Sequence, residues 1–249
     1  MRRIYLDPVD CERDHSGIYI KGSSFHYLSN VLRMKEGDIF IGFDGSGYEY
    51  KIEITSRDKR FFKGEILNAE KVVNREVLFD IVLFQSIPKG SKMDKIISEI
   101  AQLGVKKVFP VISNRVVPHL DKESIQHKKG RWKRLAAEAS KIAGTDTVID
   151  IGEPIGFEEA VKLPADAKII FWEKAITSLK DVIKPFHELK KGADIHIFIG
   201  PEGGYGDEEI ALAEEYGVVN ASIGKRILKV ETASVIAVAL TIYELENTK

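Results

Sequence analysis

The feature that most constrains the fold is the alternation of strand-like and helix-like segments from residue 77 onward. Strands are predicted at Val77–Phe84, Lys107–Ile112, Lys168–Trp172, Asp194–Ile199 and Val218–Ile223. Helices are predicted at Ser91–Leu103, Ser124–Ile142, Asp207–Tyr216 and Glu231–Leu245. Apolar strands that alternate with helices indicate a parallel sheet with helices on both faces. This part of the chain is therefore predicted to have an α/β fold.

The N-terminal part of the chain follows a different, β-rich pattern. Strands are predicted at Ile39–Phe43, Tyr48–Ile54 and Phe61–Leu67, and a short amphipathic helix at Ser24–Leu32. The first two strands flank Asp44–Gly47, an Asp-Gly turn that indicates a β-hairpin. The two patterns meet in the charged connection Glu70–Glu76. We therefore predict two domains, residues 1–72 and residues 73–249.

Charge is distributed unevenly along the chain. The total is 37 Lys and Arg against 38 Asp and Glu, net −1, yet residues 106–141 hold 10 basic and 3 acidic side chains, net +7, and residues 142–249 hold 11 and 19, net −8. A basic stretch of this kind is typical of phosphate contacts, and a solvated helix face explains it equally well. Lys128, Arg131 and Arg134 recur every three residues, so a helix gathers them near one face.

The sequence lacks the residue sets of several classes of site. Cys11 is the single cysteine, which excludes a disulfide framework and a Cys-rich zinc module and fits a reducing cytoplasm. The six histidines are scattered, so no metal site is predicted. No apolar run approaches the roughly 20 residues that cross a bilayer, and no segment fits the glycine-rich phosphate loop that ends in Gly-Lys-Ser/Thr. We expect a cytoplasmic protein without a membrane partner.

Two turns, each directly after a predicted strand, carry the functional information. The first, Gly200–Gly206, has four glycines in seven residues, more than the one or two that a tight strand-to-helix turn explains. The second, Ile223–Ala233, has a glycine at the strand exit and leads into a helix that is apolar on nearly every side; a core helix with an ordinary cap would also explain it. Loops at the carboxyl ends of parallel strands are where α/β folds bind ligands. Together the turns predict a ligand site.

These two segments resemble the RsmE family, bacterial methyltransferases of the SPOUT class that modify N3 of a uridine in 16S ribosomal RNA. The resemblance covers the whole chain, because Arg2–Tyr5, His26–Arg33, Pro88–Asp94 and Leu103–Val105 also look like this family. It implies an α/β domain of the SPOUT type, a parallel sheet with a C-terminal trefoil knot. It also implies an N-terminal PUA-like β-barrel that binds RNA.

The resemblance further implies S-adenosylmethionine as the cofactor. The residues expected to hold it are Trp172, Glu173, Phe198, Gly200, Pro201, Glu202, Gly203, Gly204, Ile223, Gly224, Ile227, Leu228, Thr232 and Ala233. The catalytic candidates are Arg226, as a stabiliser of charge, and Glu202, as a base. The alternatives are that Arg226 grips a phosphate and that Glu202 only ties the amides of its loop.

The expected partners are 16S ribosomal RNA in the small ribosomal subunit and a second copy of the chain, since a helix that is apolar all round at Glu231–Leu245 is buried. Family position and charge give the RNA-binding candidates Arg2, Arg3, Arg33, Lys89, Lys92, Arg115, Lys128, Arg131 and Arg134. The chain departs from the family's usual residues at Glu99, Gln102, Lys141 and Thr145, which leaves the details of RNA contact open. Two other functions are compatible with the fold: a SPOUT methyltransferase of the ribose 2′-oxygen and a non-catalytic RNA-binding ribosome assembly factor.

Overall fold

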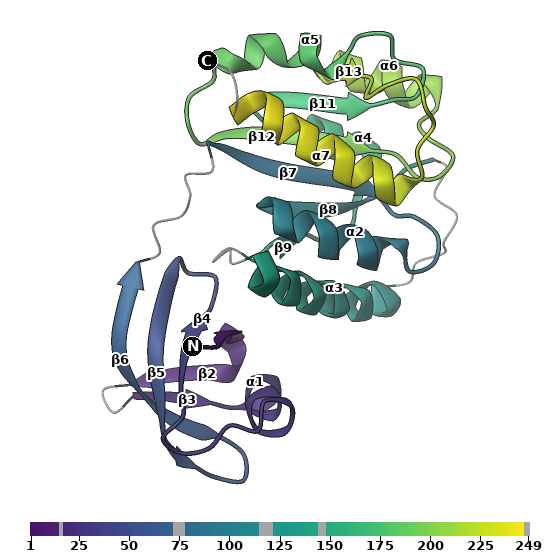
Figure 1. Ribbon diagram of the computed structural model, residues 1–249. Helices are drawn as coiled ribbons and strands as arrows, with labels where there is room; N and C mark the ends of the chain where they lie inside the picture. The colour runs from purple at the N-terminus through teal and green to yellow at the C-terminus, as the bar shows by residue number, and fades with distance from the viewer. Residues whose placement is uncertain (15–16, 72–77, 115–121, 144–147, 247–249) are drawn as a thin grey trace. The chain divides into compact units, whose positions relative to one another are not determined.

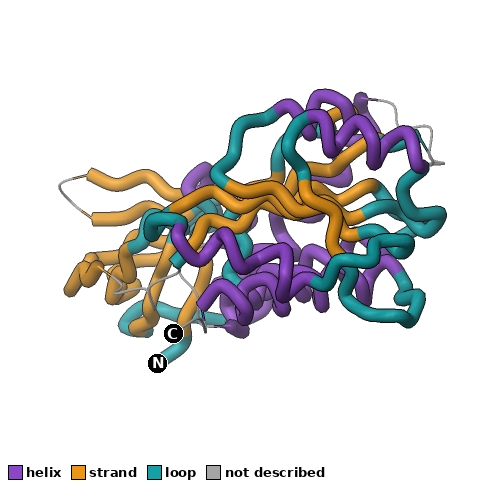
Figure 2. The backbone as a smooth tube through the Cα atoms, turned by 90° about the horizontal axis from the view of Figure 1, so that it is seen from above, coloured by secondary structure: helices purple, strands orange, loops and turns teal. Residues whose placement is uncertain are grey.

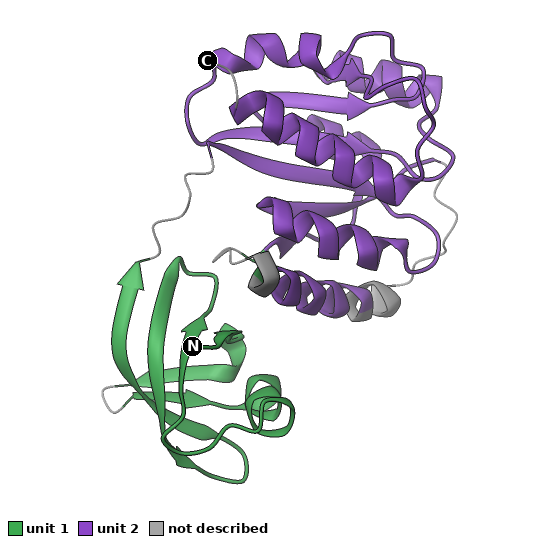
Figure 3. Cartoon of the chain, viewed as in Figure 1, with its two compact units in different colours: residues 1–76, 140–148 green, residues 77–139, 149–249 purple. Residues whose placement is uncertain are grey.

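The computed structural model describes residues 1–14, 17–71, 78–114, 122–143 and 148–246 (Figure 1). The chain divides into two compact units, Met1–Glu76 with Ser140–Val148 and Val77–Ala139 with Ile149–Lys249 (Figure 3). The C-terminal end of the helix α3 (Lys122–Ala143) is thus grouped with the first unit.

The described residues of the first unit form a six-stranded sheet in the order β1-β4-β5-β6-β3-β2. The strands are β1 (Arg3–Tyr5), β2 (Cys11–Asp14), β3 (Gly17–Ile20), β4 (Ile39–Phe43), β5 (Tyr48–Arg57) and β6 (Phe62–Lys71). β1 pairs with β4 in parallel and the other pairs are antiparallel. The unit also contains a 3₁₀ turn, η1 (Pro8–Asp10), a short α-helix, α1 (Gly22–His26), and a π-helical turn, η2 (Tyr27–Val31).

The predicted hairpin is confirmed, because β4 and β5 pair with Phe43 opposite Glu49. Alternate residues of β5 face the core, and Ile52 is fully buried. The core approaches β6 so closely that a Cβ on Gly64 would lie 2.6 Å from the Ile52 side chain. The predicted helix at Ser24–Leu32 is present as α1 followed by the wider turns of η2.

The described residues of the second unit form a seven-stranded, all-parallel sheet in the order β10-β8-β7-β12-β11-β13, with β9 beside β8. The strands are β7 (Phe79–Ser86), β8 (Lys107–Ile112), β9 (Asp150–Ile151), β10 (Ile155–Gly156), β11 (Ala167–Phe171), β12 (Ala193–Ile199) and β13 (Val219–Ala221). The five strands that the sequence predicts correspond to β7, β8, β11, β12 and β13, and the α/β class is confirmed. The short β9 and β10 are not predicted, because two residues show no periodicity.

Helices cover both faces of this sheet (Figure 2). They are α2 (Lys92–Ile100), α3 (Lys122–Ala143), α4 (Phe157–Lys162), α5 (Leu179–Ile183), α6 (Asp207–Glu215) and α7 (Val230–Glu246), with 3₁₀ turns η3 (Ala101–Leu103) and η4 (Lys184–Glu188). α2 contacts α7, and α4 contacts α6. Between the sheet and α4 and α6, the rings of Phe84 and Phe198 stack with centroids 4.6 Å apart. α7 packs against β12, α2 and α5, and its start lies next to the ends of β11, β12 and β13.

Candidate active site

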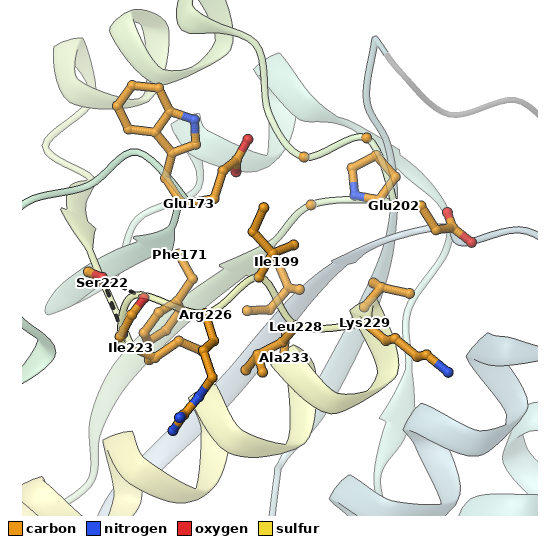
Figure 4. Close-up of a pocket in the computed structure, with 18 of the residues that line it drawn as sticks. Phe171, Glu173, Ile199, Glu202, Ser222, Ile223, Arg226, Leu228, Lys229 and Ala233 are labelled. Atoms are coloured by element: carbon orange, nitrogen blue, oxygen red, sulfur yellow. Dashed lines mark hydrogen bonds between the residues drawn. The ribbon is translucent and has the colours of Figure 1, made fainter.

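The loops that follow β11, β12 and β13 line one cavity of about 440 Å³ together with the start of α7 (Figure 4). The lining residues are Lys92, Phe171, Trp172, Glu173, Ile199, Gly200, Pro201, Glu202, Gly203, Gly204, Ala221, Ser222, Ile223, Gly224, Arg226, Ile227, Leu228, Lys229, Val230 and Ala233. β11 lies between β12 and β13 in the sheet, so the carboxyl ends of the three strands are adjacent. The cavity is therefore a direct product of the strand order.

The glycine-rich turn after β12 needs its glycines because two loops approach each other there. Gly204 has φ +63°, and a Cβ on it would lie 2.8 Å from both carboxylate oxygens of Glu173 in the neighbouring loop. A Cβ on Gly200 would lie 3.2 Å from the backbone of Gly204. The Gly204 amide donates to the Pro201 carbonyl at 2.9 Å, which closes the turn. The four-glycine pattern thus reflects close packing of backbone around the cavity.

Buried polar groups hold this turn in place. Glu209, only 4% exposed, accepts hydrogen bonds from the Gly206 amide at 2.9 Å and from the Asn114 amide at 3.0 Å. On the side of α7, the hydroxyl of Ser234 donates to Oε1 of Gln85 at 2.6 Å, and both side chains are fully buried. Because an unpaired buried polar group is expensive, these bonds fix the turn and α7 relative to the sheet.

The middle of the cavity is apolar. Phe171, Ile199, Leu228 and Ala233 lie together there, while the charged side chains lie at its edges (Figure 4). The indole nitrogen of Trp172 is buried and has no hydrogen-bond partner among the described residues. An apolar cavity of this size, with loop backbone along its edge, fits a nucleoside-like group with a polar edge.

The two catalytic candidates lie on opposite sides of the cavity, Glu202 on one and Arg226 on the other (Figure 4). Oε1 of Glu202 accepts hydrogen bonds from Nζ of Lys92 at 2.7 Å and from the Lys89 amide at 3.0 Å. Partial burial alone would raise the pKa of Glu202, but the hydrogen bonds from Lys92 and from backbone amides outweigh it and the pKa is lowered. A lowered pKa makes a carboxylate a weaker base. This geometry therefore favours a structural role, in which Glu202 binds loop amides, over the role of base. Arg226 is exposed.

Twelve of the fourteen residues predicted to hold the cofactor line the cavity, and two do not. Phe198 is fully buried in the core, where it stacks on Phe84. Thr232 is exposed in the first turn of α7. Phe198 points away because it occupies the strand position next to Ile199, and successive side chains of a strand face opposite sides.

Several lining residues were not among the sequence predictions for the cofactor: Ile199, Ala221, Ser222, Lys229 and Val230. Ile199 and Ala221 are the last residues of β12 and β13, Ser222 follows β13, and Lys229 and Val230 lie inside the predicted turn Ile223–Ala233. Their place at or after the carboxyl ends of β12 and β13 was the available indication. Lys92, predicted as an RNA contact, also lines the cavity.

The predicted RNA-binding residues are distributed over both units, and Arg115 lies outside the described residues. Arg2 donates to the Leu32 carbonyl at 3.3 Å, and Arg3 pairs with Glu49 and lies over the ring of Phe43. Arg33, Lys89 and Arg134 are exposed, Lys128 is partly buried, and Arg131 pairs with Asp94 at 2.7 Å. At the positions of departure, Glu99 pairs with Lys95 and Gln102 donates to the Ser98 carbonyl. The Lys141 side chain and Thr145 lie outside the described residues.

Comparison with known proteins decides the family. The model of an RNA methyltransferase domain matches residues 75–242, and that of an RNA methyltransferase PUA domain matches residues 20–67. Ribosomal RNA small subunit methyltransferase E of Buchnera aphidicola is 30% identical over 95% of this chain and 90% of its own length. The chain belongs to the RsmE family. The family prediction, and with it the class of RNA methyltransferase enzyme with a PUA domain, is confirmed.

Solved structures agree with this family. The RsmE protein of Neisseria gonorrhoeae, bound to S-adenosylmethionine, matches with a TM-score of 0.80 and 30% identity over 96% of both chains. A methyltransferase of Legionella pneumophila, also bound to this cofactor, matches with a TM-score of 0.84 and 28% identity over 96% of both chains. The cofactor predicted from the sequence is thus the one held by these RsmE-like structures.

Neither a membrane span nor a metal centre is found in the described part of the chain. None of its described helices has the length and apolarity that a bilayer crossing requires. Its described His, Cys, Asp and Glu side chains form no group of three that could hold a metal ion.

Proposed function

We propose that this protein transfers the methyl group of S-adenosylmethionine to N3 of a uridine in 16S ribosomal RNA and that it acts on the assembled small ribosomal subunit. The observation that carries the proposal is the cavity formed by the three loops after β11, β12 and β13. It stands in an RsmE-family chain whose solved relatives bind this cofactor. The uridine, its N3 atom and the assembled subunit come from the family resemblance.

The lining residues divide the tasks of holding the cofactor. Ile199, Leu228 and Ala233 offer an apolar surface for adenine, and the backbone at Gly200, Gly203 and Gly224 is accessible to its polar edge and to the ribose. When bound, the cofactor supplies an electrophilic methyl group on a sulfonium.

The protein's own contribution is alignment, exclusion of water and management of charge. Methyl transfer is an in-line displacement, so holding the two reactants in line supplies much of the rate. The target base must leave its stack to reach the cavity. Arg226 at one edge is then available to a phosphate or to developing negative charge, and Glu202 at the other edge holds the loops together.

A homodimer is part of the proposal. Leu240 and Tyr243 of α7 are 39% and 60% exposed, which leaves an apolar face on a helix that is apolar on nearly every side. Ile236 of α7 also lines a second hollow with Ile223–Arg226 and Leu228 of the third loop. A second copy seated on this face would cover the third loop from outside, which fits burial of apolar surface between subunits.

The proposal has four further elements, of which the family implies the first two and the sequence the other two. The loops after β12 and β13 belong to a C-terminal trefoil knot, and the sheet of the first unit closes as a PUA-like β-barrel. The domains are residues 1–72 and 73–249, and the protein works in the cytoplasm. If the knot is present, the protein should recover its native spectrum after denaturation, and it should refold more slowly than an unknotted domain of this size.

The test is methylation of small ribosomal subunits that lack the modification, followed by digestion to nucleosides and mass spectrometry. The proposal expects the added mass on uracil, with the ribose unmodified. A methyl group on the ribose 2′-oxygen would identify the ribose-directed alternative. If calorimetry detects no binding of S-adenosylmethionine to the purified protein, the chain is instead a non-catalytic RNA-binding assembly factor. Arg226→Ala should reduce kcat if this residue meets developing charge, and raise only KM if it holds a phosphate.

A further inference from the structure

Lys92 stands at the edge of the cavity as a fixed cation. It is the first residue of α2 and lines the cavity, and its ammonium donates to Oε1 of Glu202 at 2.7 Å. The same oxygen accepts the Lys89 amide at 3.0 Å, so one carboxylate joins the loop before α2 to the glycine-rich turn. An ammonium has three N–H donors. Glu202 takes one of them, which leaves two for a ligand.

The charges around Lys92 keep it protonated. Glu202 contacts it from the turn after β12, and the negative charge of Glu231 on α7 also acts on it. Oε2 of Glu231 is buried and has no hydrogen-bond partner among the described residues. The hydrogen bond to Glu202 raises the pKa of Lys92, against a smaller opposing effect of burial, and the charge of Glu231 adds to the rise. Lys92 is therefore an acid or a charge stabiliser, and it does not serve as a base.

The remaining charged groups near α2 are engaged elsewhere or exposed. On the same helix, Asp94 pairs with Arg131 of α3 and accepts the indole N–H of Trp132, and Lys95 pairs with Glu99. The other two cations of the cavity, Lys229 and Arg226, are exposed. No hydrogen bond or ion pair holds either of these two side chains within the described residues. A donor that is fixed in advance stabilises developing charge better than one that must be ordered during the reaction.

We propose that Lys92 is a catalytic residue that donates a hydrogen bond to a carbonyl oxygen of the target uracil and stabilises the negative charge left when N3 loses its proton. Glu202 is a positioning residue that orients the ammonium, and the negative charge of Glu231 favours its protonated form. In this step the N3–H bond breaks and the proton passes to water. The electron pair left on N3 then bonds to the methyl carbon, whose bond to sulfur breaks with both electrons kept by sulfur. The inference rests on the proposed function and deepens it, because it replaces a protein base by an electrostatic stabiliser.

The experiment measures kcat and KM on small ribosomal subunits between pH 6.5 and 10 for the wild type, Lys92→Gln and Lys95→Gln. Lys95→Gln is the matched control, since it removes an exposed lysine from the same helix. At neutral pH, Lys92→Gln should lower kcat by about 10²–10³-fold, the usual loss when one fixed donor to a developing anion is removed. The deficit should shrink as the pH rises toward the N3 pKa of free uridine, because solvent then forms the anion unaided. Lys95→Gln should match the wild type.

Restoring the positive charge at position 92 by chemical labelling distinguishes an effect of the charge from a structural effect of the substitution. Lys92→Cys treated with 2-bromoethylamine regains an ammonium at nearly the same reach, and treatment with iodoacetamide gives a neutral adduct of similar size. Cys11 should stay unmodified under brief labelling, because burial raises its pKa to about 12. Activity should return with the ammonium alone. Calorimetry should show an unchanged Kd for S-adenosylmethionine in each variant, which establishes that the cavity is intact.

Three results would overturn the inference. A deficit of Lys92→Gln that is equal at every pH would mark a structural role, and a change in KM alone would mark a phosphate contact. Equal activity of the two labelled proteins would exclude the charge as the active feature. Each of these requires an active wild type, so the proposed function would survive them. If the wild-type protein does not methylate N3 of uridine, the proposed function and this inference are both overturned.

Discussion

Replacing Gly204 by alanine should weaken cofactor binding through the backbone of the glycine-rich turn. Gly204 has φ +63°, a left-handed conformation in which a Cβ costs about 1–2 kcal/mol. The added Cβ would also lie 2.8 Å from both carboxylate oxygens of Glu173. That carboxylate is the end of a flexible side chain, so it moves aside at the edge of the cavity. Relief of either strain displaces a loop that lines the site.

We expect the free energy of unfolding of Gly204→Ala to fall by about 1–2 kcal/mol and the Kd for S-adenosylmethionine to rise about tenfold, equivalent to about 1.4 kcal/mol. Urea denaturation and calorimetry measure the two quantities. Gly192→Ala is the matched control, because Gly192 has φ +84°, nothing lies within 4 Å of its added Cβ, and it is not part of the cavity lining. It should lose similar stability and bind the cofactor as the wild type does.

A double variant separates strain from steric contact. Gly204→Ala should raise the Kd less in a Glu173→Ala background than in the wild type, because that background lacks the close approach and keeps the backbone strain. If Gly204→Ala and Gly192→Ala lose equal stability and both keep wild-type affinity, the close packing of this turn does not shape the cofactor site, and the reasoning from its glycines is refuted.

Three further predictions concern buried groups. Ser234→Ala leaves Oε1 of the buried Gln85 without its 2.6 Å donor, so urea denaturation should show a loss of about 1–3 kcal/mol; an unchanged midpoint would contradict this. Burial, with a contribution from the charge of Lys168, lowers the pKa of His196 from 6.5 to about 4. Between pH 6.5 and about 4 the unfolded chain therefore binds a proton at His196 that the folded chain does not bind. The free energy of unfolding should fall as the pH drops through this range, by at most about 1.4 kcal/mol per pH unit. His196→Leu should show a weaker dependence of stability on pH. Burial foremost raises the pKa of Cys11 from 9.0 to about 12, so iodoacetamide at pH 8 should alkylate the folded protein at least about 100-fold more slowly than the chain in urea; comparable rates would contradict the burial.

Much of the fold was predictable because its elements carry local patterns. The strand at Asp194–Ile199 is apolar at four of its six positions, as expected of a strand covered on both faces, and it is present as β12. The hairpin at Asp44–Gly47 depends on neighbouring residues only and is present as predicted. β9 and β10 escaped prediction because they have two residues each, and α5 because one helical turn is too short for periodicity.

The candidate site was predictable to the extent that it consists of turns directly after strands. The turns at Gly200–Gly206 and Ile223–Ala233 indicated a ligand site, and both line the cavity. The direction of Phe198 was misjudged because the strand's pleat, which turns it into the core, was not applied to the residue next to Ile199. The role of Glu202 was open in the sequence, and its partners are what make it a weak base.

By itself, the sequence determined which segments are strands, helices and glycine turns, since burial pattern and backbone freedom are properties of neighbouring residues. Only the tertiary structure decided which turns meet. Glu202 binds Lys92 across 110 positions of the chain, and Ser234 reaches Gln85 across 149. Periodicity records which side of an element is buried but carries no information on what lies against it. The strand order β7-β12-β11-β13 determines which segments meet, because it brings the three loops and the first turns of α2 and α7 around one cavity.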